Sequence, residues 1–455
     1  MKRINKLVMT LLISALFLAC SDDSAVAPVE IENRNRVEPS LKVIHSSYNT
    51  PAVDIWVNDV KEIENLVYGE SSALTNLQAG NYNIKVVPSG STSPVVIEAN
   101  LILEKNKDYT VVAAGRLEEI EPVVIVNQKM ESQKSLVRFI HSSPDAPAVD
   151  IKVDDGTGKT IFANTSFRGF NSYIAVDPGV YNLAVTPSGS EKEVAIYGNV
   201  NLMSGGIYTV NAMGTLNSDD EVPFLARTYI DEFPFAQRPN SAYEKGNSFI
   251  DLAPATSNVK VAHASPDAPA VDLYINGELA GSGLSFPAFT EYLKINSGTS
   301  NVKVTAAGTQ AAVIEGDIRF NAYKNYSIYA VDQAANIAPL IIEDNLEAPA
   351  AGKAHVRFLH LSPDAPAVDI TLPDGTVIFG NMKFKEYSEF TPLNAGMYDL
   401  QVRLAGTSTV VLELNGVNLQ GGNIYSVFAK GFVAGSGDKS LGAQIIVNNQ
   451  LLNNN

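Results

Sequence analysis

Residues 139–150, FIHSSPDAPAVD, form the stretch that decides the fold, because near copies of it stand at three other places in the chain. The copies are VIHSSYNTPAVD at 43–54, VAHASPDAPAVD at 261–272 and FLHLSPDAPAVD at 358–369. Solenoid repeats are usually about 20–50 residues long, and these copies are spaced much more widely. The spacing therefore predicts four separate domains of one kind.

Alternating short runs on either side of the motif predict β-strands. In Leu136–His141, Val137, Phe139 and His141 share one face, which we expect to point inward, whereas Arg138 and Ile140 share the other. Turn residues follow each run closely, and no long segment has the 3.6-residue period of a helix. We predict an all-β chain of four tandem β-sandwich domains, immunoglobulin-like or prealbumin-like, arranged as beads on a string. The strand order is left open.

Domain boundaries follow from the repeat positions and from the extra residues between Phe233 and Asn258, where Pro, Asn and Ser are typical of a linker. We expect a lipoprotein signal peptide at 1–19, an anchor linker at 20–40, domain 1 at 41–131, domain 2 at 135–232, a linker at 233–257, domain 3 at 258–346, a short linker at 347–353 and domain 4 at 354–452.

Composition excludes several classes of protein. The 455 residues carry a net charge of -16, and such an acidic chain is repelled by phosphate backbones, so we expect no nucleic-acid partner. Cys20 is the single cysteine, which rules out an internal disulfide, a thiolate metal cluster and a redox cysteine pair. We expect no cofactor.

The first twenty residues have the pattern of an export signal. Three of the first six are basic, and Leu7–Ala19 is apolar but too short to span a bilayer of about 30 Å as a helix. The segment ends in Leu-Ala-Cys20 followed by Ser-Asp-Asp, which resembles the lipobox of bacterial lipoproteins, although Phe17 replaces the usual leucine. We expect lipidation at Cys20 and an extracytoplasmic, lipid-anchored protein of the cell envelope, at the outer membrane, with the leaflet left open.

The repeated phrase His-x-Ser-Pro-Asp-Ala-Pro-Ala-Val-Asp resembles the hallmark of a bacterial extracytoplasmic family known as domain of unknown function 4397. The resemblance covers nearly all of the chain beyond residue 40. Repeat 1 departs from it, with Tyr-Asn-Thr at 48–50 in place of Pro-Asp-Ala. The resemblance implies an exported protein with tandem domains and assigns no activity.

The motif residues have a structural and a chemical interpretation. Each histidine shares the apolar face of its strand, where it can donate a ring N–H to a carbonyl or carboxylate of the following turn; alternatively it is a ligand or general base beside the next aspartate. Pro and Asp favour a rigid corner between two strands. The residues concerned are His45, His141, Pro144, Asp145, Asp150, His263, Pro266, Asp267, Asp272, His360, Pro363, Asp364 and Asp369.

Three chemical sites are alternatives to these structural roles. A Ser-His-Asp triad needs side chains that converge from separate elements, and neighbours on one strand point apart, so we expect no catalytic residue. The weak candidates for calcium ligands are Asp145, Asp150, Asp154 and Asp155, without the spacing of a dedicated loop. Trp56 is a candidate carbohydrate-stacking platform or, more simply, a cross-strand packing partner.

Two functions remain open at this stage. The first is a non-enzymatic envelope lipoprotein whose domains form a stalk, an adhesive surface or a platform that binds a cell-surface or extracellular protein or glycan. The second is an extracytoplasmic enzyme, or an accessory protein, that acts on polysaccharide or peptidoglycan. The second requires a site in one domain only, for which Trp56 and the pair Asp154-Asp155 are the best features.

Overall fold

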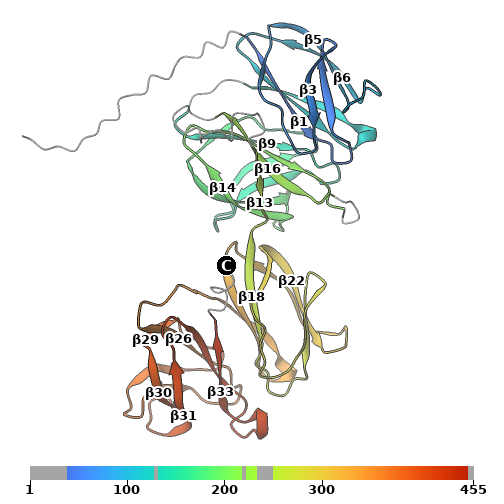
Figure 1. Cartoon of the computed structure of the whole chain (residues 1–455). Coiled ribbons are helices and arrows are strands. Elements are labelled where there is room, and N and C mark those ends of the chain that lie inside the picture. Colours follow the sequence, from blue (N-terminus) through green and yellow to red (C-terminus); the bar gives the residue numbers. More distant parts are fainter. Residues whose placement is uncertain (1–37, 128–131, 218–221, 233–248, 449–455) are drawn as a thin grey trace, which may run out of the picture.

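The computed structural model describes residues 38–127, 132–217, 222–232 and 249–448, which form four β-sandwich domains (Figure 1). The predicted signal peptide, Cys20, most of the anchor linker and residues 449–452 of predicted domain 4 lie outside the described residues. No helix in the described part of the chain is long and apolar enough to cross a membrane. The prediction of four tandem, all-β sandwich domains is confirmed.

Each domain contributes eight strands in the same order, and domain 2 has one more. Domain 1 contains β1 (Ser40–Ser46), β2 (Val53–Val57), β3 (Val60–Leu66), β4 (Thr75–Asn76), β5 (Gly80–Pro88), β6 (Ile97–Leu103), β7 (Asp108–Ala114), the 3₁₀ turn η1 (Leu117–Glu119) and β8 (Glu121–Asn127). Domain 2 contains β9 (Ser135–His141), β10 (Val149–Val153), β11 (Thr160–Thr165), β12 (Ile174–Val176), β13 (Gly179–Pro187), β14 (Ala195–Leu202), β15 (Ile207–Met213), β16 (Leu225–Glu232) and β17 (Phe249–Leu252).

Domains 3 and 4 repeat this arrangement. Domain 3 contains β18 (Thr256–His263), β19 (Val271–Ile275), β20 (Glu278–Leu284), β21 (Leu293–Asn296), β22 (Gly298–Ala306), β23 (Ala312–Phe320), β24 (Asn325–Val331), η3 (Ala334–Asn336) and β25 (Ala338–Glu343). Domain 4 contains β26 (Lys353–His360), β27 (Val368–Thr371), β28 (Val377–Met382), β29 (Thr391–Asn394), β30 (Gly396–Leu404), β31 (Val410–Leu419), β32 (Ile424–Lys430), η4 (Gly437–Lys439) and β33 (Gly442–Val447).

The strand order distinguishes between the two sandwich types that the sequence left open. In domain 1 the first sheet has the order β4-β1-β7-β8, with β1 and β7 parallel, and the second has the order β3-β2-β5-β6. Corresponding strands have the same order in the other domains. An immunoglobulin domain keeps its first two strands in one sheet, whereas here they lie in different sheets. Of the two types considered, the arrangement is therefore the prealbumin-like one.

Part of the predicted linker at 233–257 belongs to sheets. Strand β17 pairs antiparallel with β16, so the first sheet of domain 2 has five strands, and β18 already begins at Thr256. The linker prediction was wrong for residues 249–252 and 256–257. Pro and Asn elsewhere in the segment are typical of loops, and the short run Phe249–Leu252 gave too weak a strand pattern to outweigh them. Ser40 and Lys353, placed at the ends of two other linkers, are likewise the first residues of β1 and β26.

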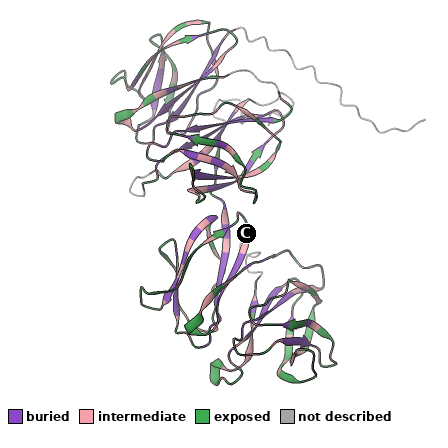
Figure 2. Ribbon diagram, turned by 180° about the vertical axis from the view of Figure 1, so that it is seen from behind, coloured by how far each residue is buried: buried purple, intermediate pink, exposed green. Residues whose placement is uncertain are grey.

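The inward face of each sandwich follows the predicted alternation. The opposite face of the first sheet is buried as well, as β9 of domain 2 shows. In domain 2, Val137 and Phe139 pack into the core with Val149 and Ile151. Yet every residue of β9 is buried, and Arg138 is only 1% exposed. The face that Arg138 and Ile140 share is buried because a neighbouring domain packs against it (Figure 2).

The domains pack in two pairs through their first sheets. Between domains 1 and 2, Ile44 and Val112 meet Ile140 and Tyr229 in one apolar cluster. Between domains 3 and 4, the outer faces of the corresponding sheets form another cluster, which contains Ala262, Tyr329, Leu359, Phe428 and Ile446. Each pair is thus a four-layered stack of sheets, and the beads touch over an apolar surface.

A smaller contact joins the two pairs. Ala184 and Ile196 of domain 2 pack with Ala255, and Ala255 N–H donates to the carbonyl oxygen of Ile196 at 2.8 Å. Tyr323 of domain 3 accepts a hydrogen bond at its hydroxyl from the side-chain amide of Asn199 at 3.0 Å. The contact between domains 2 and 3 therefore combines a few apolar side chains with hydrogen bonds from β14.

Candidate functional site

The four motif histidines are fully buried and make the same hydrogen bond. Nε2 of each ring lies 3.0–3.1 Å from the carbonyl oxygen of the proline six residues later, at Pro51, Pro147, Pro269 and Pro366. Burial lowers the pKa of each ring below its usual range, so each ring is neutral and donates from Nε2. The other ring nitrogen, Nδ1, accepts the backbone N–H of Ser47 at 3.3 Å in His45 and has no hydrogen-bond partner among the described residues in His141, His263 and His360, so none of the four rings is paired with a serine hydroxyl there.

The first aspartate of the motif accepts hydrogen bonds from the backbone of the loop that follows the seventh strand of its domain. Asp145 accepts the backbone N–H groups of Leu216 and Asn217 at 3.0 and 2.9 Å. The corresponding bonds join Asp267 to Ala334 N–H at 2.8 Å and Asp364 to Val433 N–H at 2.9 Å. In the divergent repeat 1, Asn49 Oδ1 accepts Leu117 N–H at 2.8 Å. The substitution at Asn49 thus keeps the acceptor and loses only the charge.

The second aspartate of the motif bridges two backbone positions with left-handed φ. One carboxylate oxygen accepts the N–H of a residue in the neighbouring strand, and the other accepts the N–H of a glycine in a hairpin, at 2.6–3.4 Å. The pairs are Asn65 and Gly90 for Asp54, Asn164 and Gly189 for Asp150, Gly283 and Gly308 for Asp272, and Asn381 and Gly406 for Asp369. These hydrogen bonds hold the pKa of Asp54, Asp150 and Asp272 below the usual range, against the opposing effect of burial.

The prolines that precede the first aspartate occupy the turn between the first two strands. Pro144 lies between β9 and β10, Pro266 between β18 and β19, and Pro363 between β26 and β27. Their ring restricts φ where the chain crosses from one sheet to the other. His, Pro and both aspartates therefore form one structural unit at the same end of each sandwich.

The four candidate calcium ligands do not converge. Asp145 and Asp150 bind the backbone groups described above, and Asp155 binds the Thr157 backbone N–H at 2.8 Å. Asp154 forms an ion pair with Arg319 of domain 3. Over the described residues, no three His, Cys, Asp or Glu side chains are grouped so that they could hold a metal ion.

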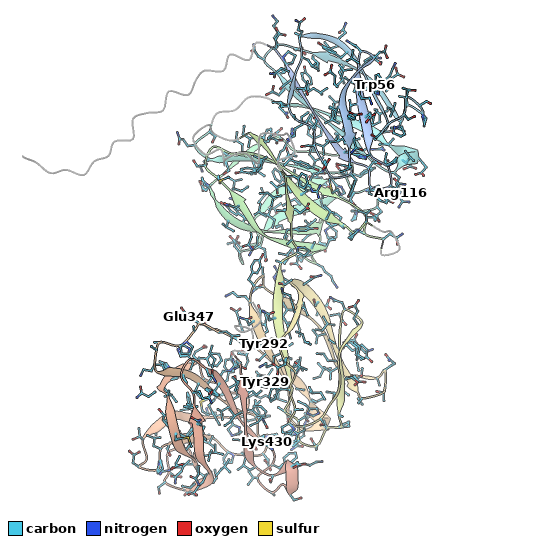
Figure 3. All side chains as sticks on the ribbon, viewed as in Figure 1. Trp56, Arg116, Tyr292, Tyr329, Glu347 and Lys430 are labelled. Carbon is cyan, nitrogen blue, oxygen red and sulfur yellow. The ribbon has the colours of Figure 1, made fainter. Side chains whose placement is uncertain are left out.

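Trp56 lies on β2 in domain 1 (Figure 3). Lys61 Nζ stands 5.7 Å from the ring centre, and the same ammonium group lies 2.9 Å from Asp54. The register pairs Trp56 with Lys61 on one side and Lys85 on the other. The indole therefore packs against Lys61, and Lys85 is its neighbour on the other adjacent strand.

Sequence reasoning missed a cavity at the motif end of domain 4. It has a volume of about 260 Å³ and lies between the two sheets, where the motif turn meets a hairpin and a long loop. Its lining is Phe358, His360, Ala365, Pro366, Val368, Val402, Leu404, Val411, Leu412, Ala429, Val433, Leu441, Gly442 and Ala443. His360 is the one lining residue with a polar side chain, and its Nε2 is already bonded to Pro366.

One substitution between the repeats helps to explain this cavity. The pairing of Met213 with Leu225 and of Lys430 with Gly442 makes Phe224 the counterpart of Leu441. Phe224 packs against the core of domain 2, whereas the smaller Leu441 lines the cavity of domain 4. The only signal in the sequence was this exchange of Phe for Leu.

Sequence reasoning also missed two buried cations at each interface within a pair. The residue three positions before each motif histidine is a lysine or arginine, and it is at most 6% exposed. The four are Lys42, Arg138, Lys260 and Arg357. The sequence did not reveal them, because a basic residue on the second face of a strand is far more often exposed to solvent than buried in a pair.

The carboxylates that face these cations lie at equivalent positions of two domains. Asp231 is in β16 of domain 2, and Asp344 directly follows β25 of domain 3. Asp231 lies 3.0 Å from Lys42 Nζ of domain 1 and 3.9 Å from Arg138. Asp344 of domain 3 lies 2.6 Å from Arg357 Nη2 of domain 4. Lys260 instead donates to the side-chain oxygen of Asn448 at 3.3 Å. These contacts link the paired domains electrostatically.

The repeated motif and its geometry agree with a comparison of the sequence with family models. The family described as "Domain of unknown function (DUF4397)" matches residues 39–152, 135–228, 257–371 and 372–455. The chain belongs to this family. No curated protein matches the DUF4397 chain.

Two solved structures have some similarity to this DUF4397 protein. The Bacillus anthracis TIE protein is 10% identical, with a TM-score of 0.17, and the match covers 83% of this chain and 65% of that one. The Bacteroides ovatus mixed-linkage glucan utilization locus SGBP-B, in complex with a mixed-linkage heptasaccharide, is 10% identical, with a TM-score of 0.10 and coverages of 77% and 87%. At these TM-scores neither structure carries an argument about fold or function.

Proposed function

We propose that this protein is a non-enzymatic, lipid-anchored binding protein of the bacterial cell envelope. In this proposal the four docked domains form a platform, and domain 4 carries the binding site. The observation that carries the proposal is the open, apolar cavity of about 260 Å³ in domain 4, which lies just below the range of about 300–1,000 Å³ usual for small-molecule sites.

The use of the motif supports a non-enzymatic role. In all four repeats the motif histidine bonds to a proline carbonyl, and the second aspartate bonds to two backbone N–H groups. Groups that are committed to structural hydrogen bonds are poor candidates for proton transfer. A panel of glycan, peptide and ester substrates with the purified chain should therefore give no turnover.

No observation favours the alternative of a polysaccharide- or peptidoglycan-acting enzyme. Its best features were Trp56 and Asp154-Asp155, and the structure places them apart, in domains 1 and 2. Trp56 packs against lysines, and Asp154 pairs with Arg319.

The anchor is proposed from the sequence around Cys20, which follows a short apolar segment. Metabolic labelling with a radioactive fatty acid should mark the expressed chain, and globomycin should change its processing. Cys20→Ala should abolish the label. External protease on intact cells then tests whether the domains face the outside. An unlabelled, soluble chain would contradict the anchor and leave a secreted binding protein.

A further inference from the structure

We propose that the domain 4 cavity binds an uncharged hydrocarbon group, such as an aromatic ring or a short acyl segment, and not a sugar. This inference rests on the proposed binding function and names its ligand class. The cavity is lined by aliphatic residues together with Phe358 and His360. The Nε2–H of His360 already donates to the carbonyl oxygen of Pro366. A hydroxyl or charge that entered would lose its water, and the lining side chains offer it one acceptor at most, the unbonded Nδ1 of His360.

The volume sets the size of the ligand. An apolar protein cavity of about 150 Å³ stays dry and binds benzene. The domain 4 cavity has about 260 Å³, so it accommodates a group larger than a single ring, such as a bicyclic aromatic or a short acyl chain. A glycan, which is larger and rich in hydroxyl groups, does not match this cavity.

The entrance is marked by two apolar side chains that solvent reaches. Val411, at the start of β31, is 38% exposed, and Val433, in the loop after β32, is 54% exposed. Both line the cavity, so its mouth lies between the β30–β31 hairpin and this loop. Exposed apolar side chains around a hollow gain when an apolar ligand covers them.

Hydrogen bonds preform this entrance. The Asp364 carboxylate accepts Val433 N–H at 2.9 Å, and Phe432 N–H donates to the carbonyl oxygen of Lys439 at 2.8 Å. The loop at 431–441 is therefore closed on itself at its base and tied to the motif turn. Asp364 is a positioning residue for the rim: the hydrogen bond that the motif makes to this loop in every domain here holds a side chain at the mouth of the cavity. A site that is already formed loses little free energy to ordering on binding.

The test uses the full mature chain with Cys20→Ala, which removes the lipid anchor, and the neutral bicyclic fluorophore naphthalene. We expect saturable binding at one site per chain. Displacement by p-xylene or by methyl octanoate would distinguish an aromatic from an acyl preference. A mixed-linkage glucan oligosaccharide should displace nothing.

Two variants and a matched control locate the site. Leu441→Phe introduces the residue that domain 2 has at this position, and Val411→Asp places a charge at the mouth. Each should weaken fluorophore binding at least about tenfold, which corresponds to about 1.4 kcal/mol. Val313, the counterpart of Val411 in β23, is 43% exposed, and Val313→Asp should leave binding unchanged.

A second readout does not depend on the variants' stability. In the methyl NMR spectrum of the parent chain, the fluorophore should shift the signals of Val411, Leu412 and Val433 and leave Val313 unmoved. Absence of saturable binding, or equal binding by the Val411→Asp and Val313→Asp chains, would overturn the inference. Fatty-acid labelling of Cys20 is measured separately. A chain that binds no fluorophore would therefore leave the proposed anchor intact, and a chain that takes no fatty-acid label would leave the proposed ligand site intact.

Discussion

The buried ion pair between domains 3 and 4 should make Asp344→Asn one of the costliest single changes in the chain. The Asp344 side chain is fully buried and lies 2.6 Å from Arg357, whose side chain is 2% exposed. Tyr292 and Ser327 hydroxyl groups both donate to the other carboxylate oxygen at 2.6 Å. Figure 3 shows Tyr292 on the side of domain 3 that faces domain 4. The amide would remove the charge that these groups surround.

The magnitude follows from counting buried charges. The network contains two buried cations, Arg357 and Lys260, and Asp344 is its buried carboxylate. Removing the one anion leaves both cations without a buried counter-charge, and breaking a buried pair in this way typically costs about 3–5 kcal/mol. Arg357 cannot escape by deprotonation, because its guanidinium keeps its proton and its pKa is raised further by Tyr329 and Asp344, against the opposing effect of burial.

The neighbouring residue provides the control. Glu343 pairs with Lys324 at 2.8 Å, but both side chains are about half exposed, so Glu343→Gln should cost at most about 1 kcal/mol. Urea unfolding followed by circular dichroism, with hydrogen exchange of β18 and β26, measures both variants. If Asp344→Asn is as mild as Glu343→Gln, the charge argument is refuted.

Three further predictions follow. Burial lowers the pKa of Lys260 from 10.5 to about 8, so the folded state is penalised for this charge below pH 8 and regains up to about 3 kcal/mol as the pH rises from 8 toward 10.5. The urea concentration at which half of the protein is unfolded should therefore be higher at pH 9.5 than at pH 7.5. A Lys260→Met chain should show no such difference, and an equal rise in both chains would contradict the attribution to Lys260. Asp369→Ala should destabilise domain 4 by about 1–3 kcal/mol, because Asn381 and Gly406 lose their acceptor, whereas the exposed Asp374→Ala should have a smaller effect in the same thermal scans. Asp364→Ala should weaken fluorophore binding several-fold by freeing the Val433 rim, and unchanged binding would remove the positioning role.

The sequence by itself determined the number and kind of the domains. Four copies of one motif at wide spacing, flanked by runs of period two, are sufficient to predict four β-sandwiches, because burial of one face demands that period. The same local logic placed His141 on the inward face and Pro144 in a corner. The alternation also indicated which side of β9 points into its own core.

Only the tertiary structure decided what covers the second face of each first sheet. The partner of Arg138 is Asp231, which is far along the chain, and the partner of Arg357 lies in another domain. A local pattern cannot distinguish a basic residue in solvent from one in a buried pair. The domain 4 cavity has the same origin: it is the space left among a motif turn, a hairpin and a loop that are distant in sequence. No single segment encodes an unfilled volume, so its existence depends on how the three meet.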